Sequence, residues 1–364
     1  MPSRFTFSFM HLLAIDWVIF TEKLILIIAV VSGSLVVAMY STYAERKVAA
    51  IIQDRRGPNR AGPFGILQPL ADGLKLFFKE EIIPKFSSKF LFILGPGIAM
   101  LTAIMIGAVV PWGNKIHIFN RDVSLQIADV NIGILYIFGI VSLGVYGIMI
   151  GGWASNNKFS LLGAMRAASQ IVSYELAMGI SLIALLMLTG TLSLKTMVAQ
   201  QMDGWWYIFK QPLGFLIFLI CAFAETNRTP FDLSEAENEL IGGYHSEYSS
   251  MKLGFYLFAE YVNMFLSSAV MVTLFFGGYD IPFVNDQTFI NTVGTNWMAV
   301  LQGFVFFIKI ACFLFLFMWV RWTIPRFRYD QLMNLGWKIL LPLALFNMLV
   351  TGALILLHQN HWHF

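Results

Sequence analysis

The sequence predicts an all-α polytopic membrane protein with about eight transmembrane helices and one amphipathic surface helix after the first span. Hydrophobic residues make up 58% of the chain and charged residues only 12%, whereas roughly one quarter of a soluble domain is charged. Apolar runs of the length that crosses about 30 Å of hydrocarbon recur along the chain. They do not alternate in the way that strands of a membrane barrel must. Residues 1–364 are therefore interpreted as a single membrane domain.

The predicted spans share their length and their low charge. They lie at 24–43, 90–111, 131–153, 171–190, 208–225, 253–277, 297–320 and 337–357. Pro96 and Pro342 fall within two of these runs and would interrupt a soluble helix. Neighbouring helices in a membrane bundle satisfy the backbone groups that a proline frees, so both spans are retained.

Lys and Arg are distributed unevenly over the connections between the spans. Most of them lie in the loops at about 44–89, 154–170, 226–252 and 321–338. Cytoplasmic loops of membrane proteins carry an excess of these residues. The four loops are therefore predicted to face the cytoplasm or its equivalent, with both chain termini on the other side.

The first of these loops predicts irregular backbone followed by an amphipathic helix. Glycines and prolines between 57 and 65 favour turns. Apolar residues then recur at helical spacing from Leu67 to Phe78, while Asp72 and Lys75 fall elsewhere on the wheel, as in a helix that lies along a membrane surface. A simple anchor would explain such a helix, but it would not require charges of both signs, from Arg46, Asp72 and Lys75, close to an apolar surface.

A carboxylate-rich loop at 225–240 lies between the fifth and sixth predicted spans, in a chain otherwise poor in acids. Acids at the edge of hydrocarbon are costly to ionise, so this cluster indicates the handling of protons, cations or a polar ligand head. Burial and neighbouring carboxylates raise the pKa of an acid toward neutrality, which a proton relay requires. Ser234 with Glu237, and Asp232 with Glu235, also have capping-box spacing, so part of the cluster could instead start a short helix.

Other residue types exclude several kinds of site. The two cysteines, Cys221 and Cys312, lie inside apolar runs without a CxxC or histidine partner, and no GxGxxG motif follows a strand. No metal, iron–sulfur or dinucleotide site is therefore predicted in this chain. Lys309 lies in the middle of the seventh predicted span, where an unpaired ammonium is costly, so we expect it to face the bundle or a hydrated cavity.

Several ordered motifs resemble the signatures of one family. They lie at 44–47, 53–59, 62–75, 166–175, 225–232, 325–333 and 336–338, within a match from about 35 to 345. On these motifs the chain resembles the H subunit of bacterial NADH:quinone oxidoreductase, respiratory complex I, the homologue of mitochondrial NADH dehydrogenase subunit 1. The resemblance implies the membrane subunit that joins the redox arm of the complex to its proton-pumping arm.

In that family, quinone enters from the bilayer between the first span, the surface helix and the sixth span. Quinone is thus the implied substrate, whereas FMN and iron–sulfur clusters belong to partner subunits and this chain alone binds no cofactor. The implied partners are the peripheral-arm subunits of the quinone site and the antiporter-like membrane subunits, with no nucleic acid. The implied location is an energy-transducing membrane, with a bacterial inner membrane favoured over the mitochondrial inner membrane.

The matching motif positions give two sets of site residues. The resemblance places along or beside the quinone tunnel Arg46, Asp72, Lys75, Arg228, Phe231, Asp232, Arg321 and Arg326. Arginine and lysine can donate to quinone oxygens while paired acids hold them in place, and Phe231 would contact the isoprenoid tail. A hydrated proton path toward the antiporter-like subunits would comprise Glu175, Glu225, Glu235, Glu237, Glu239 and Glu260.

Two features of the last cytoplasmic loop bear on the tunnel. Arg321, Arg326 and Arg328 follow a span on the cytoplasmic side and could be plain topology determinants. Trp322 stands where the family pattern has a small residue, so it is expected to narrow or reshape that side of the tunnel.

Two alternative functions belong to other classes. One is the equivalent subunit of a membrane-bound hydrogenase, which need not bind quinone. The other is an independent cation/proton transporter, for which inverted repeats would be expected. The 53–59 loop and the complete 321–333 motif favour the quinone enzymes, and the sequence has no convincing internal repetition.

Overall fold

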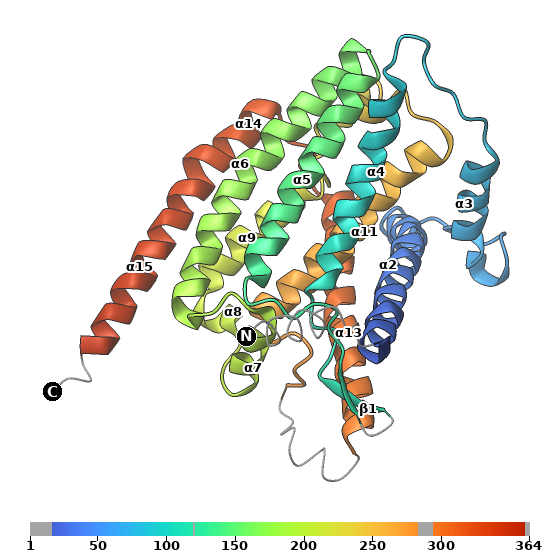
Figure 1. Cartoon of the computed structure of the whole chain (residues 1–364). Coiled ribbons are helices and arrows are strands. Elements are labelled where there is room, and N and C mark those ends of the chain that lie inside the picture. Colours follow the sequence, from blue (N-terminus) through green and yellow to red (C-terminus); the bar gives the residue numbers. More distant parts are fainter. Residues whose placement is uncertain (1–16, 119–120, 283–293, 361–364) are drawn as a thin grey trace, which may run out of the picture.

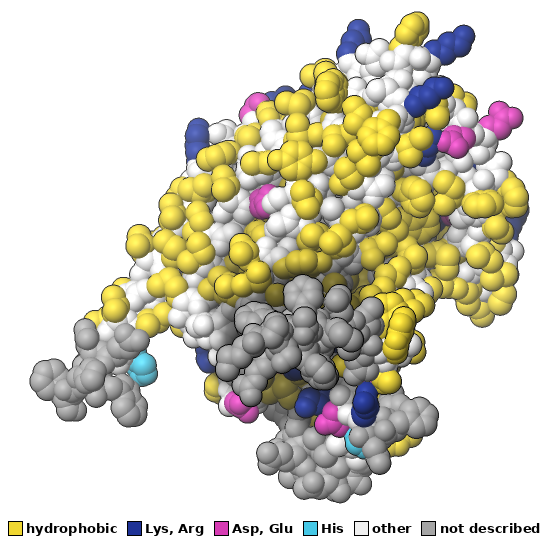
Figure 2. All heavy atoms as spheres, viewed as in Figure 1, with side chains coloured by type: hydrophobic (Ala, Val, Ile, Leu, Met, Phe, Trp, Pro, Cys, Tyr) yellow, Lys and Arg dark blue, Asp and Glu magenta, His cyan; other side chains and the backbone are white. Residues whose placement is uncertain are grey.

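The computed structural model describes residues 17–118, 121–282 and 294–360, which form a bundle of long helices (Figure 1). Seven helices in this part of the chain are long and apolar enough to cross a membrane: Trp17–Ile52, Lys89–Ala108, Gly133–Ala154, Lys158–Thr189, Ser250–Phe275, Thr295–Thr323 and Tyr329–His358. Hydrophobic side chains cover a broad face of the bundle (Figure 2). The predicted class, an all-α polytopic membrane protein, is confirmed.

The elements keep the order that the sequence predicts. The spans are α2 (Trp17–Ile52), α4 (Lys89–Met105) with η2 (Ile106–Ala108), α5 (Gly133–Ala154), α6 (Lys158–Thr189), α11 (Ser250–Phe275), α13 (Thr295–Thr323), and α14 (Tyr329–Asn334) continued by η4 (Leu335–Leu340) and α15 (Leu341–Asn360). The shorter helices are η1 (Pro63–Gly65), α3 (Gln68–Phe78), α7 (Leu194–Met202), α8 (Tyr207–Lys210), α9 (Pro212–Glu225), α10 (Glu237–Leu240) and η3 (Gly243–His245). The surface helix predicted after the first span is α3, which lies outside α2 in Figure 1.

The fifth predicted span, 208–225, is shorter than expected. Helix α9 has 14 residues, and its rise of about 21 Å is less than the bilayer core thickness. It ends because Asn227 adopts a positive φ of 49° and Pro230 cannot donate a backbone hydrogen bond. Residues 226–234 that follow are all buried. Irregular backbone at this depth is tolerated because protein, and not lipid, surrounds it.

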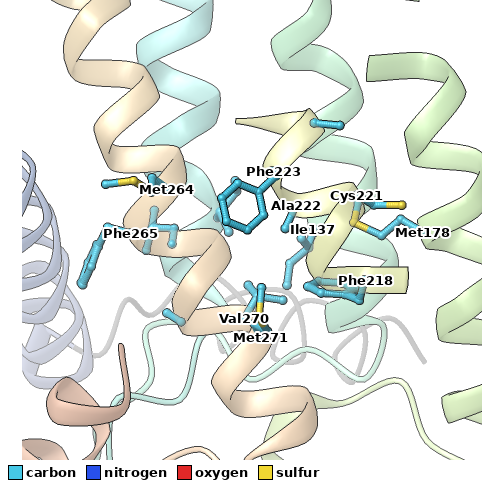
Figure 3. Packing of buried hydrophobic residues seen from close by; sticks show 14 of the residues in the cluster. Ile137, Met178, Phe218, Cys221, Ala222, Phe223, Met264, Phe265, Val270 and Met271 are labelled. Atoms are coloured by element: carbon cyan, nitrogen blue, oxygen red, sulfur yellow. The ribbon is translucent and has the colours of Figure 1, made fainter. Parts of the chain in front are cut away.

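Helix α9 lies inside the apolar core of the bundle. Figure 3 shows Phe218 and Phe223 of α9 among side chains of neighbouring helices, including Ile137 of α5, Met178 of α6 and Met271 of α11. These side chains are all buried. The core therefore fixes α9 between α6 and α11, and α9 delivers the carboxylate loop into the bundle.

Helices α4, α5 and α11 meet where glycines permit close approach. A Cβ atom on Gly151 would lie 1.9 Å from the Tyr256 hydroxyl, and one on Gly147 would lie 2.8 Å from the backbone nitrogen of Ala99. The Tyr256 hydroxyl donates to the Gly147 carbonyl at 3.1 Å, and the Tyr248 hydroxyl lies 3.2 Å from the Gly151 carbonyl. Small residues thus let α4 and α5 pack tightly, as is common between membrane helices.

A small hairpin, which the sequence analysis does not predict, joins α4 to α5. Strand β1 (Lys115–Ile118) pairs antiparallel with β2 (Arg121–Ser124), with Lys115 opposite Ser124. The backbone N–H of His117 donates to the Asn296 side chain at 2.7 Å. The hairpin therefore packs on the start of α13, at the lower end of the bundle in Figure 1.

Candidate functional site

A buried carboxylate, Glu45, holds together three helices and the carboxylate loop. Its Oε1 lies 2.5 Å from Nη1 of Arg321, and its Oε2 lies 3.2 Å from Nη1 of Arg228. The Tyr261 hydroxyl donates to Oε2 at 2.8 Å, and the Arg228 guanidinium stacks on the Tyr261 ring at 4.1 Å. Burial opposes the charge of Arg228, but Tyr261, Glu45 and the more distant carboxylate of Glu260 outweigh burial and keep its pKa above the ordinary value. We call Glu45, Arg228, Tyr261 and Arg321 the arginine cluster.

Sequence reasoning missed Glu45 as a site residue, although it lies in the 44–47 motif. The prediction chose its neighbour Arg46, which is half exposed. A signal was available in the sequence, because small side chains recur in α2 every three or four residues in step with Glu45: Ser34, Ala38, Ser41 and Ala49. That spacing places Glu45 on the face of α2 that packs into the bundle.

A cavity of about 350 Å³ opens beside the arginine cluster. It lies between α2, α3, α11 and α13, and its charged or polar lining consists of Thr42, Glu45, Arg46, Asp72, Tyr261 and Arg321. The rest of the wall includes Met39, Pro69, Gly73, Leu76, Leu257, Phe258 and Trp322. A largely apolar cavity with a few polar groups at this volume has the character of a small-molecule site.

Arg46 and Asp72 join α2 to α3 across this cavity. Nη1 of Arg46 lies 2.7 Å from Oδ2 of Asp72, and Gln68 donates to Oδ1 of Asp72 at 3.1 Å. Both charged side chains are partly exposed, so the pair adds at most about 1 kcal/mol to stability. Lys75, from the same predicted set, is exposed and is not part of the cavity lining.

Three further predicted residues, Phe231, Asp232 and Arg326, lie outside the lining of the cavity. Nη2 of Arg326 lies 2.8 Å from Oδ2 of Asp232, and burial raises the pKa of Asp232 to about 6 although Arg326 opposes this shift. Phe231 is buried between the rings of Tyr174 and Phe327, at centroid distances of 5.3 and 5.5 Å. Its side chain therefore packs in the core and does not line the cavity.

Glu235 and Glu260 meet at one phenol. The Tyr244 hydroxyl lies 3.0 Å from Oε1 of Glu235 and 2.8 Å from Oε1 of Glu260. A phenol has a single hydrogen, so it can donate to only one carboxylate, and its contact with the other is favourable when that carboxyl is protonated. Burial raises the pKa of Glu235, which favours a proton on this pair. Tyr244 is a second residue that the sequence analysis did not single out.

Two small cavities touch Glu225, and one of them also touches Glu260 of this pair. One, of about 50 Å³, has a polar lining that consists of Thr102, Glu225, Thr226, Asn227, Tyr244, Tyr256, Glu260 and Asn263. It is large enough and polar enough to hold a water molecule. The other, of about 20 Å³, also touches Glu225 but is otherwise lined mainly by apolar side chains. The structure thus brings Glu225, Glu235 and Glu260 to one buried region.

The remaining predicted acids lie around this region. The Ser142 hydroxyl of α5 donates to Oε1 of Glu175 on α6. Glu239 is exposed and pairs with Arg166 at 2.6 Å. The side chain of Glu237 lies outside the part of the chain that the structure describes. Glu239 is thus a surface residue of this chain, while Glu175 is anchored between two spans.

The capping boxes considered for this loop are wrong. Helix α10 begins at Glu237 with Ala236 as its N-cap, and no side chain caps it. Asp232 and Ser234 precede this cap and are buried in the loop. The Ser234 carbonyl packs so closely on Gly243 that a Cβ there would lie 1.7 Å away. Tertiary packing of the loop therefore outweighs its local capping preference.

Lys309 binds backbone carbonyls at the end of α11. Its Nζ donates to the carbonyls of Phe276, Gly278 and Asp280 at 2.8, 3.0 and 2.7 Å, and lies 4.5 Å from the Trp206 ring centroid. A lysine can satisfy the last carbonyls of a helix in this way. Lys309 therefore points into the bundle, as expected, with backbone carbonyls as its partners.

Within residues 17–118, 121–282 and 294–360, no group of three or more His, Cys, Asp or Glu side chains could hold a metal ion.

Known proteins match this chain over most of its length. The family model described as NADH dehydrogenase matches residues 23–352. An H subunit of the NADH-quinone oxidoreductase of Cytophaga hutchinsonii is 66% identical over 338 residues, which cover 92% of this chain and 97% of that protein. The H subunit of the Flavobacterium johnsoniae enzyme is 64% identical over 93% of this chain and 96% of its own length. NADH-quinone oxidoreductase subunit 8 of Rhodothermus marinus is 46% identical over 89% of this chain and 94% of its own length.

Proposed function

Because this chain belongs to the NADH dehydrogenase family, among the H subunits of NADH-quinone oxidoreductase, we propose that it admits quinone and couples quinone reduction to proton translocation. The observation that carries the proposal is the buried loop 226–234. This single segment contributes Arg228 to the arginine cluster beside the cavity, and it leads directly into Glu235 of the carboxylate pair.

The cavity beside the arginine cluster supports quinone entry. A quinone has an apolar tail and two carbonyl oxygens that accept hydrogen bonds. The cavity offers apolar walls from α3 and α11 and guanidinium donors from Arg46 and Arg321. Its position between the first span, the surface helix and the sixth span is the entry route that the family resemblance implies.

The carboxylate pair supports a proton relay. Glu235 and Glu260 share the Tyr244 hydroxyl, and the cavity of about 50 Å³ extends from Glu260 to Glu225. Closely spaced acids of this kind titrate together, so that a charge change at one alters proton binding by all. Reduction of quinone nearby would change the charge that Arg228 and Asp232 experience, and the loop would pass this change to Glu235. Glu175, Glu237 and the surface acid Glu239 would extend the relay.

The proposal assigns electron transfer to partner subunits. FMN and iron–sulfur clusters would lie in those chains, since this chain supplies the membrane cavity and the acids. The peripheral-arm subunits of the quinone site would contact its cytoplasmic loops, and antiporter-like subunits would pack on its apolar flanks. Its relatives come from bacteria, so the proposed location is a bacterial inner membrane.

The relay is tested by replacing Glu225 in the complete complex reconstituted in liposomes. Glu225→Gln keeps the size of the side chain but removes the proton-binding carboxylate, so we expect quinone reductase activity and proton pumping to fall together. Glu80→Gln, at an exposed carboxylate, is the matched control. Wild-type turnover and proton stoichiometry in Glu225→Gln would contradict the proposal.

A further inference from the structure

We propose that His245 is the residue through which protons enter the carboxylate pair from the cytoplasmic side. The inference rests on the proposed relay and adds its donor. His245 ends η3, on the loop that the positive-inside rule places at the cytoplasm. Its side chain is 18% exposed, and its Nε2 lies 4.0 Å from Oε1 of Glu235. The side chain of Glu235 is 17% exposed, so both groups lie near the loop surface, and the imidazole faces the carboxylate pair.

The hydrogen bond of Nδ1 fixes the tautomer of this imidazole. Nδ1 lies 2.5 Å from the carbonyl oxygen of Gly242. A carbonyl can only accept, so Nδ1 carries the hydrogen, and Nε2 is the nitrogen that gains and loses a proton. The ring also stacks on Tyr244, with centroids 5.2 Å apart. Both contacts hold Nε2 toward Glu235.

The groups around His245 suit it to donate a proton. Burial lowers the pKa of His245, and the carboxylate of Glu260 on α11 opposes that shift. Burial raises the pKa of the acceptor Glu235. Donor and acceptor therefore approach each other in proton affinity, which favours rapid transfer. Ser160 of α6 and Asn157, the N-cap of that helix, are neutral and bind Ser246 and Glu247.

The transfer moves one proton and no electrons. A hydronium ion on the cytoplasmic side gives its proton to Nε2 and leaves as water, which makes the imidazolium while Nδ1–H stays bonded to the Gly242 carbonyl. The Nε2 proton then passes to Oε1 of Glu235, and the neutral imidazole is restored. The 4.0 Å gap is longer than a hydrogen bond, so one water or a small ring rotation bridges it. From Glu235 the proton reaches Glu260 by way of the Tyr244 hydroxyl.

His245 could instead have a purely structural role, in which Nδ1–H closes the turn at Gly242. Variants distinguish this role from proton entry. The amide nitrogen of asparagine can replace Nδ1, so His245→Asn keeps a donor to Gly242 and removes the base at Nε2. His245→Ala removes both. His117→Asn, at the exposed histidine of the hairpin, is the matched control.

The experiment measures pumping and quinone reductase activity of the complete complex in liposomes. We expect His245→Asn to lower both by at least about tenfold, since a positioned proton donor contributes roughly 10²–10⁴-fold. Added imidazole should restore part of the activity of His245→Ala. Pyrazole, which has a similar shape but is not basic at neutral pH, should not.

The outcomes separate this inference from the relay. If His245→Asn works like wild type while Glu225→Gln is inactive, the relay stands and the role of His245 is overturned. If His245→Ala is inactive, imidazole does not rescue it and His245→Asn is active, His245 is structural. If Glu225→Gln also retains full pumping, the relay itself fails.

Discussion

Glu45 and Arg228, which lie 183 positions apart in the sequence, form an ion pair with 3.2 Å between Oε2 and Nη1. Both side chains are almost fully buried, with 8% and 4% of their surface exposed. The pair ties the first span to the loop that delivers the carboxylates. A buried pair of this kind is weak support for stability as such, but the removal of one partner leaves an uncompensated charge.

Glu45→Gln should therefore destabilise the subunit strongly. The substitution leaves the guanidinium groups of Arg228 and Arg321 without the carboxylate that both of them contact, at a cost of about 3–5 kcal/mol. We expect a sharp fall in the amount of assembled complex and in its thermal unfolding temperature. Asp72→Asn breaks a partly exposed pair and should cost at most about 1 kcal/mol. Equal losses in the two variants would argue against a central role for Glu45.

Trp322→Ala should weaken quinone binding. Trp322 lines the cavity of about 350 Å³, and loss of its apolar contact would cost about 1–2 kcal/mol, or roughly tenfold in KM. Because the ring lies in the entry cavity, we expect kcat to change little. Trp319→Ala on the same helix is the control, since Trp319 is exposed and is not part of that lining. The measurement is the KM of the complete complex for a short-chain quinone, and an unchanged KM would exclude Trp322 from the path.

The helices could be predicted from the sequence because their signal is local. Spans and the surface helix follow from run length and apolar spacing, and they occur in the predicted order. The short length of α9 could not be predicted in the same way. It depends on the buried backbone of 226–234, which only neighbouring helices make tolerable.

The candidate site was predictable in its regions but not in its contacts. The family motifs named the arginines beside the cavity and the acids of the carboxylate loop. A motif does not say, however, which way a side chain points. Two residues predicted to lie along the tunnel are elsewhere in the structure: Phe231 is in the core and Lys75 is on the surface. Glu45 carried a helical-spacing signal and Arg228 lies in a family motif, but the pairing of these two residues could be identified only from tertiary structure.

The pH dependence of activity should report Asp232. Its pKa is raised to about 6, so the carboxylate is ionised and paired with Arg326 above that pH and is neutral below it. We expect quinone reductase activity to fall as the pH drops through about 6, and Asp232→Asn to lack this acidic limb. Arg326 opposes the rise of the pKa, so Arg326→Gln should move the limb to higher pH. A limb that stays in place in both variants would assign it to another group.

The raised pKa of Asp232 also determines how the stability of the folded protein changes with pH. The pKa of Asp232 in the folded protein exceeds the ordinary value of 3.8, so the folded state binds a proton that the unfolded chain has released. The stabilisation from this proton is fully present below pH 3.8 and is lost as the pH rises through about 6. Thermal unfolding at several pH values, compared between wild type and Asp232→Asn, would measure it.

Tyr244→Phe should separate the relay from packing when it is compared with Tyr248→Phe. Both tyrosines are buried and lie against Tyr256, with centroids 5.1 Å apart in each case. The Tyr244 hydroxyl lies between Glu235 and Glu260, whereas the Tyr248 hydroxyl lies against two backbone carbonyls. Each substitution should cost about 1 kcal/mol of stability through the lost hydrogen bond.

Only Tyr244→Phe should also impair proton transfer, because it removes the group through which the two carboxyls exchange a proton. We expect pumping and quinone reductase activity to fall by about tenfold or more in this variant, with a larger solvent deuterium isotope effect on turnover. Tyr248→Phe should keep both activities per assembled complex. If both variants retain full activity, the Tyr244 hydroxyl is a packing group and the proton passes directly between Glu235 and Glu260.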